Sequence, residues 1–441
     1  MSKDKQRIKW EDLEFPEEHV KNGENYPDKL FYIVRRYIKY EGICSVINSC
    51  IGHFLYIEEM KKNTQKEIVP IIDMLHYHSD LWMMDETQND WELFFEQPQL
   101  VYGFNDIEKA QNVLLGSSFR IFVNYETIYF YEDQIKLCNN IYQKYIHANI
   151  ALKKNIRLWK DKLFLDNRKI IGCFMRMGIA AGKDIEKNLE EEKKKELGAE
   201  LFEGWNMKYY PDCPTKQEIV CIIRKYLAQW DATHVFVSID DEETLEYIKE
   251  ELGDVILSIP RNRPQFYDRG APKLEIYEKK FIEVEGAERY DRNLGYLTEI
   301  YLLSQCQSFL CGRSSGAATA VIINGNQYQH KYYFSSLYRY LDEESLQLFC
   351  SQYTKIYVFG TGNWGTYIAN YLSDKEIIYE GFIVSNRHIN GDTIMQHPIY
   401  QLSKAKLDDT CGVVVGVKSY QTIVTELEKR GIKNYYVIGE V

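Results

Sequence analysis

The sequence predicts an α/β protein built on parallel, doubly wound sheets. In its middle part, apolar strands such as THVFVSID and DVILSI alternate with amphipathic helices such as DEETLEYIKEELG. Regular alternation of this kind favours a parallel sheet with helices on both faces. A second series of strands and helices begins at KIYVF, residues 355–359. With 441 residues, the chain is long enough for two or three such domains.

The composition is that of a folded protein, and its charge excludes some classes of partner. Apolar residues make up 45% of the chain and charged residues 27%. The net charge of −11 argues against nucleic acid or an anionic lipid surface. No apolar run is long enough to span a membrane, and the first residues, MSKDKQRIKWEDLEF, lack the core of a signal peptide. We therefore expect a cytoplasmic protein; a peripheral contact with the inner membrane face and a homo-oligomer stay open.

Neither the cysteines nor the histidines predict a metal site. The 10 cysteines include no C-x-x-C pair, and several lie in apolar runs such as IIGCFM, so we expect reduced core thiols. His76 and His78 in HYH alternate as on a strand, but no third ligand follows nearby in the sequence. No bound metal is expected.

Residues 1–165 are predicted to form a first domain with many helices and few strands. A helix is expected in GICSVINSCIGHFLYIEEMKKN and a short strand in KEIVPIIDM. Residues 131–162 are expected to form one long helix, because charges lie on one side and Ile, Leu and Tyr on the other.

Residues 166–350 are predicted to form a second domain in which three strands end in polar side chains. The strand in RKIIGCFMRMG ends near Arg176, and VFVSID ends in Asp240 and Asp241. Ligands of open α/β sheets bind at such carboxyl ends. The acidic pair could hold a base or a sugar hydroxyl of a nucleotide, or could only cap the helix that follows. The charged stretch 183–200 is expected to be a solvated helical insertion.

The third strand end is an anion site by its pattern. The strand SFLCG leads into Arg313, Ser314, Ser315 and Gly316, which open the small-residue helix AATAVIING. Free backbone N–H groups and hydroxyls at a positive helix end suit a diphosphate, which Arg313 and Arg176 could neutralise. Alternatively, the two serines only cap the helix, and the spacing does not decide between these interpretations.

In this order, these strand ends resemble the motifs of the α1,6- and O-fucosyltransferase superfamily, which includes the bacterial nodulation fucosyltransferases. IIGCFMRMGIAAGKD is similar to the first motif and keeps its arginine as Arg176, but has Phe174 and Ile179 in place of a histidine and an aspartate. VFVSIDDEE is similar to the second motif, a strand that ends in an acidic pair. WELFFEQP, residues 91–98, resembles a recurrent acceptor-side segment of bacterial relatives.

The third motif of the superfamily is similar to TEIYLLSQCQSFLCGRSSG. Glu299 stands at its acidic position, and Ser314 and Ser315 stand at its serine pair. The resemblance implies a GT-B-like fold of two Rossmann-type domains. Residues 1–165 would face the acceptor, and residues 166–350 would bind the nucleotide-sugar donor.

The resemblance also implies an activity. It is the inverting, metal-independent transfer of fucose, or a related sugar, from a GDP-sugar such as GDP-fucose to an oligosaccharide or glycan acceptor. In a bacterium, such a glycosyltransferase would act on a surface-glycan precursor in polysaccharide biosynthesis. The GDP-sugar is then a co-substrate, and no separate cofactor is implied.

An inverting transfer needs a general base on the acceptor hydroxyl and stabilisation of the departing diphosphate. Counting from Arg176 as in the superfamily, the base position falls on Asp184, with Glu186 close by. The resemblance assigns the diphosphate to Arg176, Arg313 and the backbone of Ser314, Ser315 and Gly316. It assigns the ribose or the base to Glu299 and to Asp240 or Asp241.

Residues 354–441 are predicted to form a small third domain around a glycine-rich loop. KIYVFGTGNWGTYIANYL places Gly360, Gly362 and Gly365 between a strand and a helix, as in a Rossmann turn. The next strand ends GFIVSNRHINGD, where Arg387 and its neighbours replace the acidic residue that would bind an NAD ribose, which argues against NAD.

Four strands and no substrate domain are expected in this C-terminal unit. The unit resembles small Rossmann-like modules found beside bacterial sugar-modifying and capsule-assembly enzymes. It is interpreted as an accessory domain for a nucleotide, a nucleotide-sugar or another protein.

Two other functions stay open from the sequence. The C-terminal loop could serve a nucleotide-binding oxidoreductase or sugar epimerase. Alternatively, the chain could be a non-catalytic scaffold that binds a nucleotide-sugar, because the first motif departs from its pattern at Phe174 and Ile179.

Overall fold

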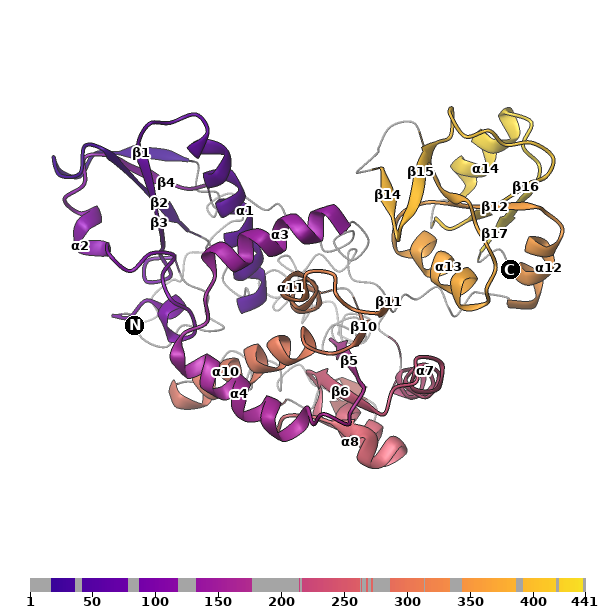
Figure 1. Cartoon of the computed structure of the whole chain (residues 1–441), viewed down its shortest axis with the longest axis horizontal. Coiled ribbons are helices and arrows are strands. Elements are labelled where there is room, and N and C mark those ends of the chain that lie inside the picture. The colour runs from indigo at the N-terminus through magenta and orange to yellow at the C-terminus, as the bar shows by residue number, and fades with distance from the viewer. Residues whose placement is uncertain are drawn as a thin grey trace, which may run out of the picture.

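The computed structural model confirms a mixed α/β architecture with sheets rich in parallel strands (Figure 1). Sheets of four, five and six strands follow one another along the chain, with a separate pair formed by β8 (Tyr267–Asp268) and β9 (Ala271–Pro272). Asp184, Arg313 and the charged stretch 183–200 lie outside the described residues. The structure describes residues 17–35, 42–77, 87–117, 132–176, 214, 216–261, 263, 267–268, 271–272, 286–312, 314–333, 343–385, 392–417 and 420–438.

The N-terminal sheet has the strand order β1-β4-β2-β3, and β2 pairs in parallel with both β3 and β4. Strand β2 is buried on both faces, because helix α1 packs on one side and the segment around α2 packs on the other. The expected helix and strand are found as α1 and β3. The elements are β1 (Glu18–Val20), β2 (Lys29–Val34), α1 (Ile43–Lys61), β3 (Glu67–Ile72), η2 (Asp90–Leu93), α2 (Phe104–Ile107) and β4 (Val113–Leu115).

The prediction of one long helix over residues 131–162 is wrong. The structure has two helices here, α3 (Glu132–Tyr145) and α4 (Ile150–Leu163). Asn149 separates them, because its side-chain oxygen accepts the N–H of Leu152 at 3.0 Å and caps α4. Its amide group also donates to backbone carbonyls of the η2 turn at 3.0 and 2.9 Å. The tertiary contacts of Asn149 therefore interrupt the helix, although the sequence pattern is amphipathic throughout.

The middle sheet is entirely parallel, with the strand order β11-β10-β5-β6-β7. From β5 the chain proceeds through β6 to β7, and it then returns to the other side of β5 with β10 and β11. Helices α7 and α8 pack together, and α10 packs against α4 and α11 (Figure 1). The elements are β5 (Ile170–Met175), α7 (Lys216–Gln229), β6 (His234–Ile239), α8 (Glu242–Leu252), η5 (Gly253–Val255), β7 (Ile256–Leu257), α10 (Gly286–Leu303), β10 (Ser308–Cys311), α11 (Ser315–Asn324) and β11 (His330–Tyr333).

The C-terminal sheet has six strands rather than the expected four, in the order β14-β15-β13-β12-β16-β17. The additional pair, β14 and β15, is joined by Met395 and Gln396, whose φ angles are 51° and 64°. Two left-handed residues make a tight hairpin turn, but the Asn-Gly signal that usually announces it is missing. The elements are α12 (Glu343–Ser351), β12 (Lys355–Phe359), α13 (Asn363–Asp374), β13 (Gly381–Val384), β14 (Thr393–Ile394), β15 (His397–Gln401), β16 (Cys411–Val415), α14 (Tyr420–Lys429) and β17 (Tyr435–Val437).

The C-terminal sheet is attached to the middle one through the end of α13. The Asp374 carboxylate accepts hydrogen bonds from Tyr226 at 2.8 Å and from Gln229 at 3.1 Å, both on α7. Helix α12, which precedes the predicted boundary at 354, contacts this unit as well, since Gln347 donates to the hydroxyl of Tyr371 at 2.7 Å. The domain boundaries stay predictions.

Nine cysteines lie in the described part of the chain, and all are free thiols. Eight are buried, whereas Cys221 is exposed although it stands in an apolar run. Burial raises the pKa of the Cys173 thiol to about 12, which makes it an inert core residue. In the portion of the chain that is described, no helix combines the length and the apolar character needed to cross a membrane.

The glycine loop between β12 and α13 predicts a contrast in stability between two substitutions. A Cβ atom at Gly365 would lie 1.8 Å from the carbonyl oxygen of Gly360, whereas none of the described atoms lies within 4 Å of one at Gly362. We expect Gly365→Ala to lower the free energy of unfolding by about 1–3 kcal/mol or more. Gly362→Ala should change it by no more than about 0.5 kcal/mol. Urea denaturation of both variants measures the difference, and equal midpoints would contradict this loop geometry.

Candidate functional site

The carboxyl ends of β5 and β10 mark the point where the strand order of the middle sheet reverses. Strand β5 has β6 on one side, where Met175 is in register with Ile239. On its other side lies β10, where Cys311 is in register with Phe174. Ligands of open α/β sheets bind outside the strand ends at such a switch point. Two of the three strand ends singled out in the sequence therefore flank the third.

Arg176 and Asp240 follow neighbouring strands and form an ion pair. Nε of Arg176 donates to Oδ2 of Asp240 at 3.0 Å, and the side chains are 30% and 11% exposed. Asp241, in contrast, is completely buried and caps α8, because its carboxylate accepts the N–H of Thr244 at 2.8 Å. The acidic pair is thus divided: Asp240 contacts Arg176, and Asp241 has the capping role. Whether either one binds a ligand stays a prediction.

The start of helix α11 lies on the other side of Arg176, at the end of β10. Ser314 caps the helix, because its side-chain oxygen accepts the N–H of Ala317 at 3.1 Å. Ser315 and Gly316 occupy the first turn, where backbone N–H groups have no carbonyl acceptor within the helix. No acidic residue lies in this turn to neutralise the positive helix end. Ser314 therefore caps the helix, whereas the N–H groups of Ser315 and Gly316 in the same turn are the candidates for binding an anion.

Gly316 allows α11 to approach the strand that carries Arg176. A Cβ atom at this position would lie 2.3 Å from the hydroxyl of Tyr296 and 2.7 Å from the ring of Phe174. Phe174, which departs from the histidine of the first motif, is 1% exposed and lies behind the helix start. The ring of Phe174 therefore packs against the first turn of α11.

The first turns of α1 join the N-terminal sheet to this site. Asn48 donates to the carbonyl oxygen of Ser315 at 3.3 Å and contacts the hydroxyl of Thr319. Burial raises the pKa of the Cys44 thiol to about 11, while hydrogen bonds with Tyr296 and Thr319 and the charge of Arg176 lower it. Helix α1 begins after β2, at the carboxyl edge of the N-terminal sheet. The helix that starts at that edge therefore contacts the helix that starts at the switch point.

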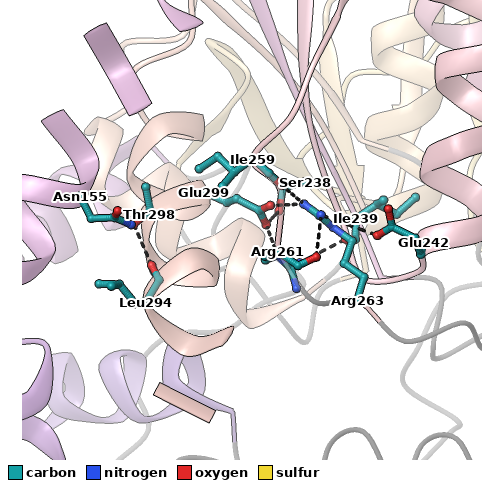
Figure 2. Close-up of polar contacts among 10 residues, drawn as sticks. All are labelled: Asn155, Ser238, Ile239, Glu242, Ile259, Arg261, Arg263, Leu294, Thr298 and Glu299. Atoms are coloured by element: carbon teal, nitrogen blue, oxygen red, sulfur yellow. Dashed lines mark hydrogen bonds and ion pairs between the residues drawn. The ribbon is translucent and has the colours of Figure 1, made fainter. Parts of the chain in front are cut away.

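Behind the end of β6, Glu299 lies at the centre of a buried ionic cluster (Figure 2). Ser238 donates to its Oε2 at 2.7 Å. Nε of Arg261 donates to the same oxygen at 3.0 Å, and Arg263 bonds to Oε1. Both guanidinium groups also donate to the carbonyl oxygen of Ile239, at 3.1 and 2.9 Å. The cluster therefore ties helix α10 to the last residue of β6, directly before Asp240.

The two oxygens of Glu299 thus contact groups of its own chain, which indicates that it positions the end of β6. A direct contact of Glu299 with ribose or base stays a prediction. The side chain of Arg263 is 1% exposed, and this burial lowers the pKa of its guanidinium although Glu299 acts against the shift. Glu242 lies 3.8 Å from Arg263 and adds a second carboxylate to the cluster.

Arg261 and Arg263 were not among the site residues expected from the sequence. They follow the strand DVILSI in the segment PRNRP, so that a fourth strand end also delivers charged side chains to the same edge of the sheet. Two arginines spaced by one residue after a strand would have been a usable signal. Their burial, however, depends on Glu299, which is on a helix further along the chain.

The predicted site residues thus fall into three groups. Those at the switch point are Arg176, Asp240, Ser314, Ser315 and Gly316. Asp241 and Glu299 are completely buried behind it. Asp184 and Arg313 lie outside the described residues. Over the described ranges, no three His, Cys, Asp or Glu side chains are grouped so that they could hold a metal ion.

The glycine loop of the C-terminal sheet is a separate candidate site. Gly360 has a φ angle of +106°, which favours glycine, and the carbonyl of Gly360 leaves no room for a Cβ at Gly365. Gly362 precedes α13 as its N-cap, without a side-chain capping bond. Two of the glycines are therefore required by the turn itself, and the space beside Gly362 is open toward the helix start.

No protein-family model matches the chain, and no curated protein matches its sequence. Among solved structures, it is similar to NodZ alpha-1,6-fucosyltransferase soaked with GDP-fucose, with a TM-score of 0.38 and 13% identity, covering 66% of this chain and 92% of that chain. Fucosyltransferase NodZ from Bradyrhizobium has a TM-score of 0.38 and 13% identity, with coverages of 66% and 90%. The apo form of POFUT1 has a TM-score of 0.39 and 10% identity, with coverages of 71% and 99%. The site itself is defined by the strand ends and contacts of this chain.

The buried cluster predicts that Glu299 is essential for stability. Glu299→Ala leaves the buried guanidinium groups of Arg261 and Arg263 without their shared carboxylate, which should cost about 3–5 kcal/mol of folding free energy. Asp161→Ala is the matched control, because Asp161 pairs with Arg157 at 3.7 Å with side chains 67% and 85% exposed. It should change stability by no more than about 0.5 kcal/mol. Similar chemical denaturation midpoints for the two variants would contradict the structural importance of the cluster.

Proposed function

We propose that the chain is a fucosyltransferase-like glycosyltransferase, which transfers fucose or a related sugar from a GDP-sugar to a glycan acceptor. The observation that supports this most strongly is that Arg176 and the start of α11 follow the neighbouring strands β5 and β10 at the switch point of the middle sheet. A guanidinium and unpaired helix N–H groups are the donors that a diphosphate requires. Both stabilise the negative charge that grows on the leaving group during sugar transfer.

The nucleoside is proposed to lie toward β6. The carboxylate of Asp240 is 11% exposed and lies next to Arg176. A carboxylate accepts hydrogen bonds from ribose hydroxyls, and also from the N–H groups of a guanine base. The resemblance of the strand ends to the fucosyltransferase motifs points to the same arrangement.

The acceptor is proposed to approach from the N-terminal sheet. Helix α1 starts at the carboxyl edge of this sheet, and it contacts α11 through Asn48 and Ser315. Binding sites are frequent where two domains meet. An acceptor at this edge and a donor at the switch point would be held close together, as a bimolecular transfer requires.

The finer parts of the proposal follow the motif resemblance. They are inversion at the anomeric carbon, independence of a metal ion, a GT-B-like pairing of the first two domains, and a surface-glycan precursor of a bacterium as the acceptor. The motif spacing predicts Asp184 as the general base and Arg313 as a second diphosphate ligand. The proposed location is the cytoplasm, and a peripheral contact with the inner face of the membrane stays open.

Arg176→Ala tests the proposed diphosphate site. We expect GDP, but not UDP or NAD, to raise the melting temperature of the natural chain, because a ligand that binds only the folded state stabilises it. We expect the variant to lose most of this effect and to release GDP from GDP-fucose about 100- to 1000-fold more slowly. Differential scanning fluorimetry and a GDP-release assay measure the two effects.

Arg224→Ala is the matched control for this experiment. Arg224 belongs to the same sheet domain and pairs with Glu251 at 2.8 Å, but its side chain is 53% exposed and it lies on α7. It should leave both readouts unchanged. Stabilisation by GDP without any turnover would support the non-catalytic scaffold instead, and no response to GDP would count against the donor site.

The glycine loop supports a second candidate function, a nucleotide site in the C-terminal unit. Gly360 and Gly365 shape a tight turn before α13, and Gly362 leaves the helix start open. Such a loop can hold a diphosphate against backbone N–H groups. An oxidoreductase or epimerase based on this unit would bind its nucleotide here rather than at Arg176.

Gly362→Ala separates the two candidate functions. We expect GDP to stabilise this variant as it stabilises the natural chain, because Gly362 and Arg176 follow strands of different sheets. The measurement is the shift in melting temperature with GDP and with NAD. Stabilisation by NAD that disappears in Gly362→Ala would assign the principal ligand to the C-terminal unit and reject the first proposal.

A further inference from the structure

The carboxyl end of β3 presents a histidine that is oriented by a buried aspartate. Asp73 follows the last residue of β3 and has a side chain only 7% exposed, whereas the side chain of His76 is 62% exposed. Nδ1 of His76 lies 2.9 Å from Oδ2 and 3.1 Å from Oδ1 of Asp73. This pair belongs to neither site described above.

The contact with Asp73 determines which imidazole nitrogen can act as a base. An ionised carboxylate only accepts hydrogen bonds. Nδ1 must therefore carry a hydrogen atom, with which it donates a hydrogen bond to Asp73. The lone pair is then on Nε2, at the opposite edge of the ring. Nε2 of His76 has no hydrogen-bond partner among the described residues, and its side chain is mostly exposed. The arrangement matches a general base held in its active tautomer.

Turn formation alone does not account for this contact. Oδ1 of Asp73 accepts the backbone N–H groups of Leu75 and His76 at 3.1 and 3.0 Å, which is sufficient to close the turn. Oδ2 makes the shorter contact with the imidazole. The ring also meets the ring of Phe104 edge to face, with centroids 5.8 Å apart. The imidazole is therefore held from two sides, although its side chain is 62% exposed.

The pair lies at the sheet edge that is joined to the donor site. Strands β2 and β3 are parallel and in register, with Val34 opposite Ile72, and the N–H of Asp73 bonds to the carbonyl of Val34 at 2.9 Å. Helix α1 leaves this same edge and contacts the start of α11 through Asn48. His76 is therefore on the side of the N-terminal sheet from which the acceptor is proposed to approach.

We propose that His76, oriented by Asp73, is the general base of the transfer in place of Asp184. This inference rests on the proposed function. Nε2 takes the proton of the acceptor hydroxyl as the acceptor oxygen forms its bond to the anomeric carbon of the sugar. The bond from that carbon to the diphosphate oxygen breaks, and GDP leaves with the electron pair. The imidazolium that forms is stabilised by the carboxylate of Asp73 and later loses its proton to water.

Two substitutions in the full chain test the assignment, with GDP-fucose as the donor and water as the acceptor. We expect His76→Ala to slow GDP release by about 100- to 10,000-fold. We expect Asp73→Asn to slow it as well, since an amide oxygen can still accept the turn N–H bonds but the amide N–H favours the wrong imidazole tautomer. The melting-temperature shift caused by GDP should be the same in both variants, because neither residue holds the donor.

His147→Ala is the matched control. His147 is an exposed histidine of the same part of the chain, whose Nε2 bonds to the carbonyl of Gln143 at 3.1 Å, and its replacement should leave GDP release unchanged. If the natural chain is not stabilised by GDP, the proposed function itself fails. If GDP stabilises the chain but His76→Ala keeps the natural rate, or if the natural chain releases no GDP from GDP-fucose, the assignment of His76 is overturned while the GDP site stands.

Discussion

A carboxylate with no exposed surface must be neutralised by its neighbours, and Glu299 is neutralised by Arg261 and Arg263. The same guanidinium groups bond to the carbonyl of Ile239, so the neutralisation also fixes the last residue of β6. Because β6 is in register with β5, the positions of the next residues along both strands are fixed too. A largely buried charge cluster thus determines where the partly exposed ion pair of the candidate site can lie.

The contact between α1 and α11 is the second constraint, because it brings the carboxyl edges of two sheets together at one candidate site. Each helix begins at the carboxyl edge of a parallel sheet, which is where ligands of such sheets bind. The bond from Asn48 to the carbonyl of Ser315 brings the two helix starts together. Burial raises the pKa of the Cys44 thiol on α1, and the charge of Arg176, which follows β5, acts against that rise. A donor on one edge and an acceptor on the other would therefore need no large approach of the domains before reaction.

The strand ends could be predicted from the sequence because each apolar run stops at a polar residue, as at Arg176 and Asp240. Features that depend on tertiary contacts could not. The break between α3 and α4 comes from the bonds of Asn149 to the η2 turn, while the amphipathic pattern continues through it. The hairpin at Met395 and Gln396 uses left-handed residues that lack the usual turn signal. The arginines below β6 were missed because only their partner on a distant helix explains why they are buried.

The balance of charge around the switch point favours one orientation of the donor. On the β6 side, the two buried guanidinium groups face Glu299 and Glu242, so positive and negative charges are matched. On the β10 side, the start of α11 has no acidic residue in its first turn. An anion gains more from the side where the helix end is not neutralised. In the proposed function, the diphosphate would therefore lie beside α11 and Arg176, and the hydroxyl or amide donors of the nucleoside would lie beside the carboxylate of Asp240. With this orientation the sugar of the proposed donor would extend from the diphosphate toward the α1 edge, on the side of the N-terminal sheet that carries His76.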